Sequence, residues 1–550
     1  MILTPEIVRL RSRYEELKMI RSAHEEALRD AQKFVSPHRA SFDNVSSLSA
    51  GGRREGDQSK NTFDDTAVWA NQMFANGLSS YLIPKAERWA YLKPQGIPSA
   101  SLNDKELVFL EGLSNKVDHT YSVPKSQFYQ AGHEVFHDLG SFGTAVVHVD
   151  RDKPIIKFKA CPLADCFFDV NEESEVDTMY YRRFLSTKAL IQMFPHVTAI
   201  DGFDPRATNR SFELVYSVEP SQDIRAKTGG RIGGERPFKA TYWVTELASV
   251  LQEGHKSYFP YLVPRWMRMA GEIWGRSPAM TCMSQIRVIN KMVKELLKSA
   301  ELSNSPPLVA EDDSIMMPVQ FGSNRFIFHE AGTPAPTALV SGSQPNLTLE
   351  MLRDYREQIT KAFFVDQIIR DHKKERQSVT EIQDDRGQML QQLGPLLARQ
   401  EAEYLSPAIE HTVEWLQDKR DPIFDQMPDS LRGQELEIVY TSPAAHAQYA
   451  SGIGNMSAFL QDITPMMQQD PTIADSLDPH EMMVTYGRMR NVPRNIFRSE
   501  KAVGDIREGR AQQEQQQQQQ AAMPEMAGAM KDIASAKATD PEGIGQLLTQ

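Results

Sequence analysis

The chain has 550 residues, 40% of them hydrophobic and 24% charged, so it can bury a large core and is not a wholly disordered protein. Its 61 Lys and Arg residues and 73 Asp and Glu residues give a formal net charge of −12, which argues against tight general binding to DNA but leaves local contact open. Three cysteines, an odd number, argue against a disulfide framework and indicate a reducing compartment. The charged N-terminus and the lack of a long apolar run predict a soluble, intracellular protein without a signal peptide or membrane span.

The first half of the sequence predicts a mixture of helices and strands. Periodic apolar residues indicate helices at 7–31, 65–83, 103–123 and 125–139, the second with Asp64 or Asp65 as N-cap and the fourth ending at Gly140. A polar loop is expected at 36–60 and a glycine-rich loop at 225–237. Runs of β-branched and aromatic residues predict strands at 144–150, 154–159, 178–184, 213–218 and 238–245.

The second half is mainly helical. Helices are expected at 278–302 and 347–364, with a proline-containing compact insertion between them. A long helix is expected at 380–419, kinked near Pro395 because proline lacks an amide hydrogen and its ring clashes with the preceding turn. A short strand at 436–441 precedes further helix to about residue 510, and the tail beyond is glutamine-rich and of low complexity.

One short motif suggests metal chemistry. His133, Glu134 and His137 form an H-E-x-x-H pattern, which on a helix places two imidazoles on one face for zinc and a carboxylate as general base. The extended motif needs a third histidine where Gly143 stands, and the other candidate for a third ligand is a carboxylate farther on, such as Asp150 or Glu172. The alternative is an ordinary structural helix, since the pattern fixes only three positions.

Other catalytic signatures are missing from the sequence. It contains no P-loop, no dinucleotide-binding glycine motif after a strand, no G-x-S-x-G nucleophile elbow and no C-x-x-C pair. Cys161 and Cys166 lie near predicted strands and are expected to be small buried hydrophobic residues. A basic cluster between two predicted helices contains Arg370, His372, Lys373, Lys374 and Arg376. It is either a solvated helix end or a surface that meets an anionic partner.

Four segments that occur together and in order resemble the head-to-tail connector, or portal, family of short-tailed bacteriophages. The resemblance covers about residues 6–432, and Ala90 stands where an aromatic residue is expected. The segments are Thr66–Pro84 with Trp89–Leu92; Gly143–Val147 leading into Cys161–Asp165; Pro264–Trp266 leading into Gly271–Pro278; and Thr380–Ile382 leading to Leu393–Pro395.

The resemblance implies an α+β, mainly helical portal fold with wing, stem, clip and crown, assembled as a dodecameric ring. The parts that it implies in this chain are the wing at 1–275, the first stem helix at 276–303, the clip at 304–346, the second stem helix at 347–363, the channel loop at 364–379, the long kinked helix and return strand at 380–442, a helical crown region at 443–510 and the Gln-rich tail at 511–550.

By the same resemblance, the ring is the channel at one capsid vertex through which double-stranded viral DNA is packaged and ejected. The basic cluster would then lie in the channel loop and hold the DNA backbone weakly, while the acidic subunit keeps the rest of the channel repulsive. Glu311, Asp312 and Asp313 in the clip would dock the terminase packaging motor and the tail adaptor protein.

The remaining expectations concern partners and chemistry. Major capsid and scaffolding proteins are further expected partners, and the location would be the virion after assembly in the host cytoplasm. No enzymatic activity, cofactor, metal or membrane contact is expected. The alternatives are a zinc-dependent hydrolase that uses His133, Glu134 and His137, and a helical scaffold or adaptor without a channel.

Overall fold

The computed structural model describes residues 4–39, 42, 62–97, 102–207, 210–221, 237–304, 308–309, 337–338, 345–365 and 393–441, together with isolated positions after 458. The chain divides into two compact units. The first contains the described residues of Met1–Tyr91, Leu113–Asp425 and Tyr440–Gln448, and the second those of Leu92–Gly112, Gln426–Val439 and Tyr449–Gln550. None of the described helices combines the length and the hydropathy that crossing a membrane requires.

A five-stranded antiparallel sheet forms one side of the first unit. Its strands follow one another in sequence order, and each pairs antiparallel with the next. The strands are β4 (Cys166–Val170), β5 (Val176–Ser186), β6 (Ser211–Pro220), β7 (Phe238–Val244) and β8 (Ser249–Lys256).

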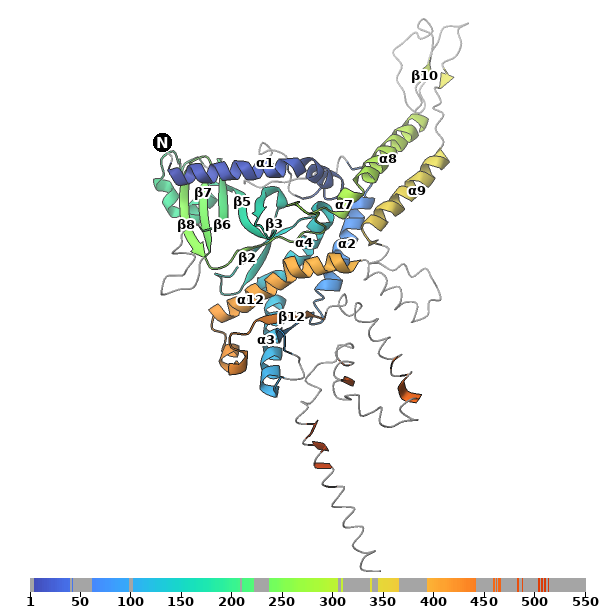
Figure 1. The fold of residues 1–550 in the computed structure, drawn as a ribbon. Coiled ribbons are helices and arrows are strands. Elements are labelled where there is room, and N and C mark those ends of the chain that lie inside the picture. Colours follow the sequence, from blue (N-terminus) through green and yellow to red (C-terminus); the bar gives the residue numbers. More distant parts are fainter. Residues whose placement is uncertain are drawn as a thin grey trace, which may run out of the picture. The chain divides into compact units, whose positions relative to one another are not determined.

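Helix α1 (Pro5–Phe34) lies across one face of this sheet, as Figure 1 shows. Its apolar stripe packs on alternate residues of the strands, because successive strand residues point to opposite faces. At the centre, the Tyr14 ring meets Phe167 and Trp243 edge-on, with ring centroids 5.1 and 5.8 Å away. The Tyr14 hydroxyl donates to Glu213 at 2.7 Å, so this buried polar group has a partner.

The opposite face of the sheet is covered by α5 (Thr187–Met193) and the short 3-10 turn that follows it. Ser186 begins α5 by accepting a hydrogen bond from the backbone N–H of Ala189 at 3.4 Å. Leu190 and Val197 then pack against Phe212 and Val244, whose strand neighbours face α1. The five-stranded sheet is therefore the middle layer of three.

A second, three-stranded sheet has the order β3–β2–β9; one helix packs beside it, and a second helix packs on the first. Its strands are β2 (Val146–Asp150), β3 (Lys157–Cys161) and β9 (Tyr261–Leu262), and the helices are, in that order, α4 (Phe128–Phe142) and α2 (Thr66–Leu82). The close approach of the two helices depends on Gly140, where a Cβ atom would lie 2.8 Å from the Phe74 ring. The expected end of α4 at Gly140 is wrong for this reason. The helix continues to Phe142, and Gly143 caps it with a φ of +74°, which suits glycine.

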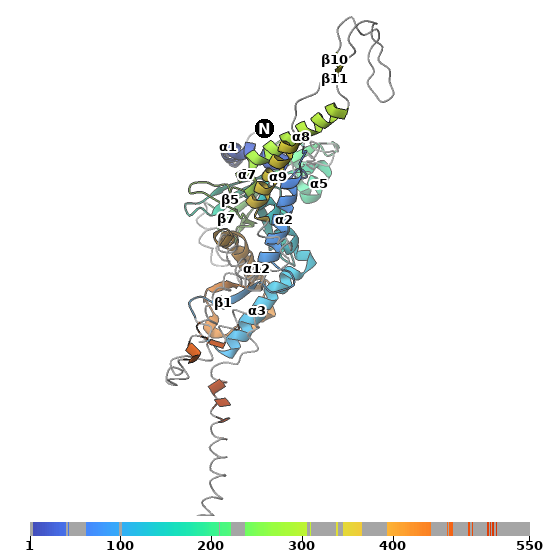
Figure 2. The same cartoon turned by 90° about the vertical axis from the view of Figure 1, so that its right-hand side faces the viewer.

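Two long helices leave this body side by side and run antiparallel (Figures 1 and 2). A short helix, α7 (Pro278–Thr281), leads into α8 (Met283–Asn304), and α9 (Pro345–Ala362) returns. Between them, the described residues include the two-residue strands β10 (Leu308–Val309) and β11 (Thr337–Ala338), which pair antiparallel.

The last helical stretch of the first unit begins at residue 393 of the described chain and ends with α12 (Ser406–Asp418). It is interrupted by a π-helical turn at Glu401–Leu405. Pro407 lies just beyond this turn, and its missing amide hydrogen and bulky ring account for the irregularity. Residues 393–400 are regular helix, and the kink expected near Pro395 stays a prediction because residues 380–392 lie outside the described part.

The second unit contains part of α3 (Asp104–Ser122) and of the paired strands β1 (Ala90–Pro94) and β12 (Leu436–Tyr440). Within it, Lys93 and Glu437 form an ion pair at 3.1 Å across the two strands. The remaining expected helices of the C-terminal region and the Gln-rich tail fall almost entirely outside the described residues.

Candidate functional site

The root of the α8–α9 helix pair is a junction held by close backbone approach and buried hydrogen bonds. Its first component is the contact between the α4–β2 turn and the segment that precedes α7. The Trp266 N–H donates to the Gly143 carbonyl at 2.8 Å, and the Gly275 N–H donates to the Thr144 hydroxyl at 2.9 Å. A Cβ atom at Gly275 would lie 2.1 Å from the Gly143 carbonyl oxygen, so only glycine permits this approach.

The same segment sets the direction of the first helix. Ser277 is fully buried, and its hydroxyl accepts a hydrogen bond from the Met280 N–H at 2.9 Å. Pro278 occupies the first helical position, where its lack of an N–H costs nothing. The start of α7 is therefore fixed on the body by a cap and by the glycine contact behind it.

A buried polar clamp then holds α8 and α9 on the body at one level. The side-chain oxygen of Asn290, on α8, accepts hydrogen bonds from the N–H groups of Phe63 at 2.9 Å and Asp64 at 3.2 Å. The Asp64 carboxylate receives the Arg356 guanidinium of α9 through Nη2 at 2.7 Å and Nε at 3.2 Å. Asn290 and Asp64 are 5% and 4% exposed, so losing either partner would leave a buried polar group unsatisfied.

An aromatic cluster fixes the end of α9. Phe363 is fully buried and meets the ring of Phe74, on α2, with a centroid separation of 6.4 Å. Phe74 also packs edge-on against Trp266 at 4.9 Å, and Trp266 lies 6.3 Å from Phe364. Phe364 has a φ of +58°, a left-handed conformation that turns the chain away from the helix.

Arg265, the neighbour of Trp266, holds the helix that begins at residue 393. Its guanidinium and its backbone N–H both bind the Glu403 carboxylate, at 2.9 Å from Nη2 and 2.8 Å from the amide. Its carbonyl accepts a hydrogen bond from the Gln400 side chain at 2.8 Å. Arg265 and Trp266 thus anchor the described chain on both sides of residues 366–392.

This arrangement is mechanical rather than catalytic in character. The Asp64 clamp holds the two helices, and Arg265 and Trp266 hold the two flanks of the segment 366–392. The ion pair between the buried Arg265 and the half-buried Glu403 adds geometric specificity. The basic residues proposed for DNA contact (Arg370, His372, Lys373, Lys374 and Arg376) lie outside the described residues, as do Glu311, Asp312 and Asp313. Their roles stay predictions.

The H-E-x-x-H residues are on α4, as the sequence predicted, but two of them have structural partners. His133 Nε2 forms a hydrogen bond with the Asn76 side chain at 2.9 Å, and Glu134 pairs with Arg39 at 3.2 Å. Burial lowers the pKa of His133, and the nearby His137 adds to this effect. Within the described ranges, no group of three or more His, Cys, Asp or Glu residues is arranged to hold a metal ion. The zinc interpretation therefore finds no support here.

The three cysteines are buried and free, which confirms the expectation for Cys161 and Cys166 and extends it to Cys282. Burial raises the pKa of Cys161 and of Cys282 to about 12, which keeps both thiols protonated near neutral pH. Because the thiolate is the nucleophile, this environment does not suit covalent catalysis.

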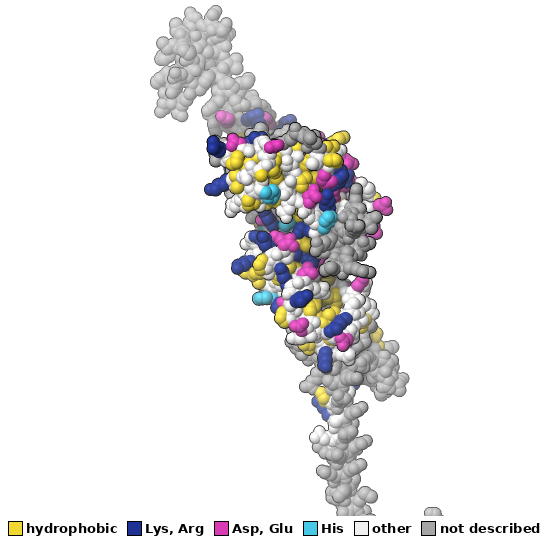
Figure 3. All heavy atoms as spheres, turned by 90° about the vertical axis from the view of Figure 1, so that its left-hand side faces the viewer, with side chains coloured by type: hydrophobic (Ala, Val, Ile, Leu, Met, Phe, Trp, Pro, Cys, Tyr) yellow, Lys and Arg dark blue, Asp and Glu magenta, His cyan; other side chains and the backbone are white. Residues whose placement is uncertain are grey.

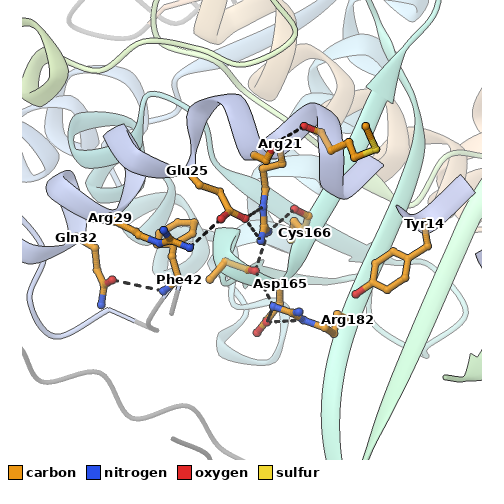
Figure 4. A network of polar contacts seen from close by, with 12 residues as sticks. Tyr14, Arg21, Glu25, Arg29, Gln32, Phe42, Asp165, Cys166 and Arg182 are labelled. Atoms are coloured by element: carbon orange, nitrogen blue, oxygen red, sulfur yellow. Dashed lines mark hydrogen bonds and ion pairs between the residues drawn. The ribbon is translucent and has the colours of Figure 1, made fainter. Parts of the chain in front are cut away.

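Elsewhere on the first unit, buried charge is used to join α1 to the sheet (Figure 4). The Arg21 guanidinium lies 3.9 Å from the Phe167 ring centre and donates to the Ala164 carbonyl at 2.8 Å. Arg182 covers the same ring and pairs with Asp165 at 3.2 Å. On the face shown in Figure 3, basic and acidic side chains are interspersed, a pattern that does not favour continuous phosphate contact there.

The residues that sequence reasoning missed are those of the clamp. Asp64 was expected only as a helix cap, and it does accept a hydrogen bond from the Thr66 N–H at 3.0 Å. Its partners Asn290 and Arg356 are 226 and 292 residues away, and a polar residue on a helix usually indicates a solvated face. The one available signal was that Asn290 interrupts the apolar stripe of α8.

Comparison with known proteins agrees with the resemblance. Residues 8–497 match the family described as bacteriophage head to tail connecting protein. A portal protein of Salmonella phage epsilon15 is 24% identical over 98% of this chain and 97% of its own length. A probable portal protein of Bordetella phage BPP-1 is 23% identical over 92% of this chain and 91% of its own. Since the family match spans most of the sequence, the chain belongs to the bacteriophage head to tail connecting protein family.

Proposed function

We propose that this chain is a portal protein, a structural component of the phage virion that forms a ring-shaped channel at one capsid vertex. Double-stranded viral DNA would pass through this channel during packaging and ejection. The observation that carries the proposal is the family match over residues 8–497, which includes the whole body and the α8–α9 helix pair.

The geometry of the helix pair supports this role. A conduit needs walls that keep their orientation under load, and the buried clamp at Asp64 with the Gly143–Gly275 contact provides a fixed root for both helices. The acidic subunit, with a net charge of −12, also suits a channel through which DNA must slide rather than bind.

The proposed ring is a dodecamer, and its partners follow from the same role. The packaging motor and the tail adaptor would dock on the clip, residues 304–346, and the major capsid and scaffolding proteins would surround the ring. Assembly would take place in the host cytoplasm. DNA hydrolysis and ATP hydrolysis are assigned to no residue of this chain.

The mass and outline of the purified assembly test the proposal directly. Light scattering with negative-stain imaging is expected to give a closed ring with a central hole, of about 750 kDa for twelve subunits (12 × 62.2 kDa). A compact assembly without a hole would favour a helical scaffold or adaptor and contradict the channel.

The DNA contact assigned to the basic cluster has its own test. Lys373→Glu combined with Lys374→Glu is expected to leave ring assembly intact and to reduce genome packaging or retention. Lys125→Glu combined with Lys188→Glu changes the net charge equally at two exposed lysines of the body and serves as the matched control. Normal packaging by the first variant would remove these residues from the mechanism.

A further inference from the structure

Three arginine side chains meet beside the helix that begins at residue 393. Arg265 and Arg268 belong to the segment that follows β9, and Arg399 lies on the helix, four positions before Glu403. The guanidinium groups of Arg265 and Arg268 both donate to the Ser174 carbonyl, through Nη2 and Nη1 respectively and each at 3.1 Å, so they are close neighbours. Arg265, Arg268 and Arg399 together form the arginine cluster.

The positive charges of the cluster act on one another. Burial lowers the pKa of the Arg268 guanidinium, and the charges of Arg265 and Arg399 lower it further, while Glu403 opposes this effect. The carboxylates on the β4–β5 turn do not neutralise the cluster: Glu172, Glu173 and Glu175 are exposed and form no ion pair with it. The arginine cluster therefore holds more positive than negative charge.

The one neighbouring carboxylate that pairs with the cluster is bound entirely by Arg265. The Glu403 oxygens accept hydrogen bonds from Arg265 Nη2 at 2.9 Å, Nε at 3.1 Å and the backbone N–H at 2.8 Å. Arg399 forms no hydrogen bond or ion pair with a described residue, and its Nη1 atom is buried without a hydrogen-bond partner. A buried guanidinium nitrogen without an acceptor is costly, which makes this atom a candidate for binding an anion.

A small anion can reach the cluster from solvent. Arg268 is partly exposed, and Met269 beside it is 51% exposed. Arg268 uses one N–H for the Ser174 carbonyl, and its other N–H groups bind no described residue. The cluster thus combines an accessible guanidinium with donors to spare, a buried guanidinium nitrogen without an acceptor, and a third guanidinium fixed by Glu403.

We propose that Arg268 and Arg399 bind a phosphate group, with Arg265 as a third positive charge held in place by Glu403. A phosphate presents oxygens in three dimensions and can accept from guanidinium groups that approach from different elements, whereas a carboxylate has two oxygens in one plane. The phosphate can belong to a DNA backbone or be free in solution, and the chemistry of recognition is the same. This site lies outside the basic cluster at residues 370–376 and does not require the ring.

Binding of inorganic phosphate to the purified full-length protein tests the proposal. Sodium phosphate is expected to raise the unfolding temperature more than sodium chloride does at the same pH and ionic strength, because only a bound anion stabilises the folded state by mass action. In titration calorimetry, Arg399→Gln and Arg268→Gln are each expected to weaken phosphate binding by about tenfold or more. The matched control is Arg206→Gln, at an exposed arginine of the same unit, which is expected to bind phosphate as the wild type does.

Stability without phosphate separates a binding role from a structural one. In phosphate-free buffer, Arg399→Gln is expected to be at least as stable as the wild type, because it removes a charge that faces two others of the same sign. In phosphate, the order is expected to reverse, since only the wild type gains from the bound anion. Arg399→Lys keeps the charge but loses the planar fork, so its affinity is expected to lie between those of the wild type and Arg399→Gln.

Competition with short duplex DNA identifies the source of the phosphate. Displacement of inorganic phosphate by the duplex, with weaker duplex binding by Arg399→Gln, would assign the site to the DNA backbone; phosphate binding that the duplex does not displace would assign it to free phosphate. Two results would overturn the proposal: equal stabilisation of the wild type by phosphate and chloride, or unchanged phosphate affinity in Arg399→Gln. Failure of the proposed function would appear separately, as a wild-type assembly without a central hole.

Discussion

The body around α1 and the helix pair α8–α9 are stabilised in different ways. In the body, α1 and the turn after α5 cover both faces of the five-stranded sheet, and Tyr14, Phe167 and Trp243 fill the space between α1 and the strands. The helix pair has apolar contacts and the Asp64 clamp at its root, but its outer faces carry charge and exposed apolar groups. The comparison indicates that the body contains its own core, whereas the helix pair is held mainly by the contacts at its root.

Removing a buried aromatic side chain from the body tests whether the body contains its own core. Trp243→Ala deletes a fully buried side chain that packs on Tyr14, and we expect it to lower the free energy of unfolding by about 3–5 kcal/mol. Urea denaturation at fixed subunit concentration measures the change, because assembly makes apparent stability depend on concentration. Trp69→Ala on α2 is the matched control, since Trp69 is 46% exposed and its loss should cost much less. Equal losses for the two variants would contradict the assignment of the core.

A smaller and local effect is expected at the clamp. Asn290→Leu removes the acceptor for the N–H groups of Phe63 and Asp64, and unsatisfied buried donors cost about 1–3 kcal/mol. Because the clamp joins the helix pair to the body, faster amide hydrogen exchange is expected in α8 and α9 and not in α1 or the sheet. Gln358→Ala, at an exposed position of α9, is the control. Uniformly faster exchange in every element would show that the two regions unfold together.

The contrast between the regions also explains what the sequence could predict. Apolar periodicity predicted α1, α8 and α9 because each has a buried stripe, and β-branched runs predicted β6 and β7. Strand β8 was missed because Ser249–Lys256 is largely exposed and polar at the sheet edge, so it has no alternating apolar pattern. The π-helical turn at Glu401–Leu405 was not predicted, because apolar periodicity does not distinguish a π-helical turn from the α-helix around it.

The candidate site was less predictable than the fold. The segments that carry the resemblance contain Gly143, Arg265, Trp266 and Gly275, which the structure brings together at the root of the helix pair. Their order was visible in the sequence, but their contact was not, since it joins residues more than a hundred positions apart. The role of Asn290 in the clamp was still harder to predict from the sequence, because a single polar residue on a helix is usually solvated.

The smallest expected effect concerns the helical stretch that Arg265 holds. Burial raises the pKa of Glu401 to about 6, so the folded protein binds this proton more tightly than the unfolded chain does. This preference for the protonated carboxyl group stabilises the folded protein fully below a pH of about 4.5. The stabilisation is lost as the pH rises through 6, because the carboxylate then carries its charge in a partly buried position. Glu401→Gln should therefore raise stability at pH 7–8 by about 1 kcal/mol, after a discount for solvent exposure, and have no effect near pH 4.

His411, on the same helical stretch, should respond in the opposite direction. Burial and the nearby Arg151 lower the pKa of His411 to about 4, so the folded protein favours the neutral imidazole. The stabilisation that results is present above pH 6.5 and is lost as the pH falls toward 4. His411→Gln should flatten the acid side of the stability profile, and Glu401→Gln the neutral side. Thermal unfolding followed between pH 4 and 8 separates the two. If Glu401→Gln changed stability equally at pH 4 and pH 8, the effect would come from altered packing at the π-helical turn rather than from the charge of the carboxylate. The protonation of Glu401 would then make no contribution to the stability of the body.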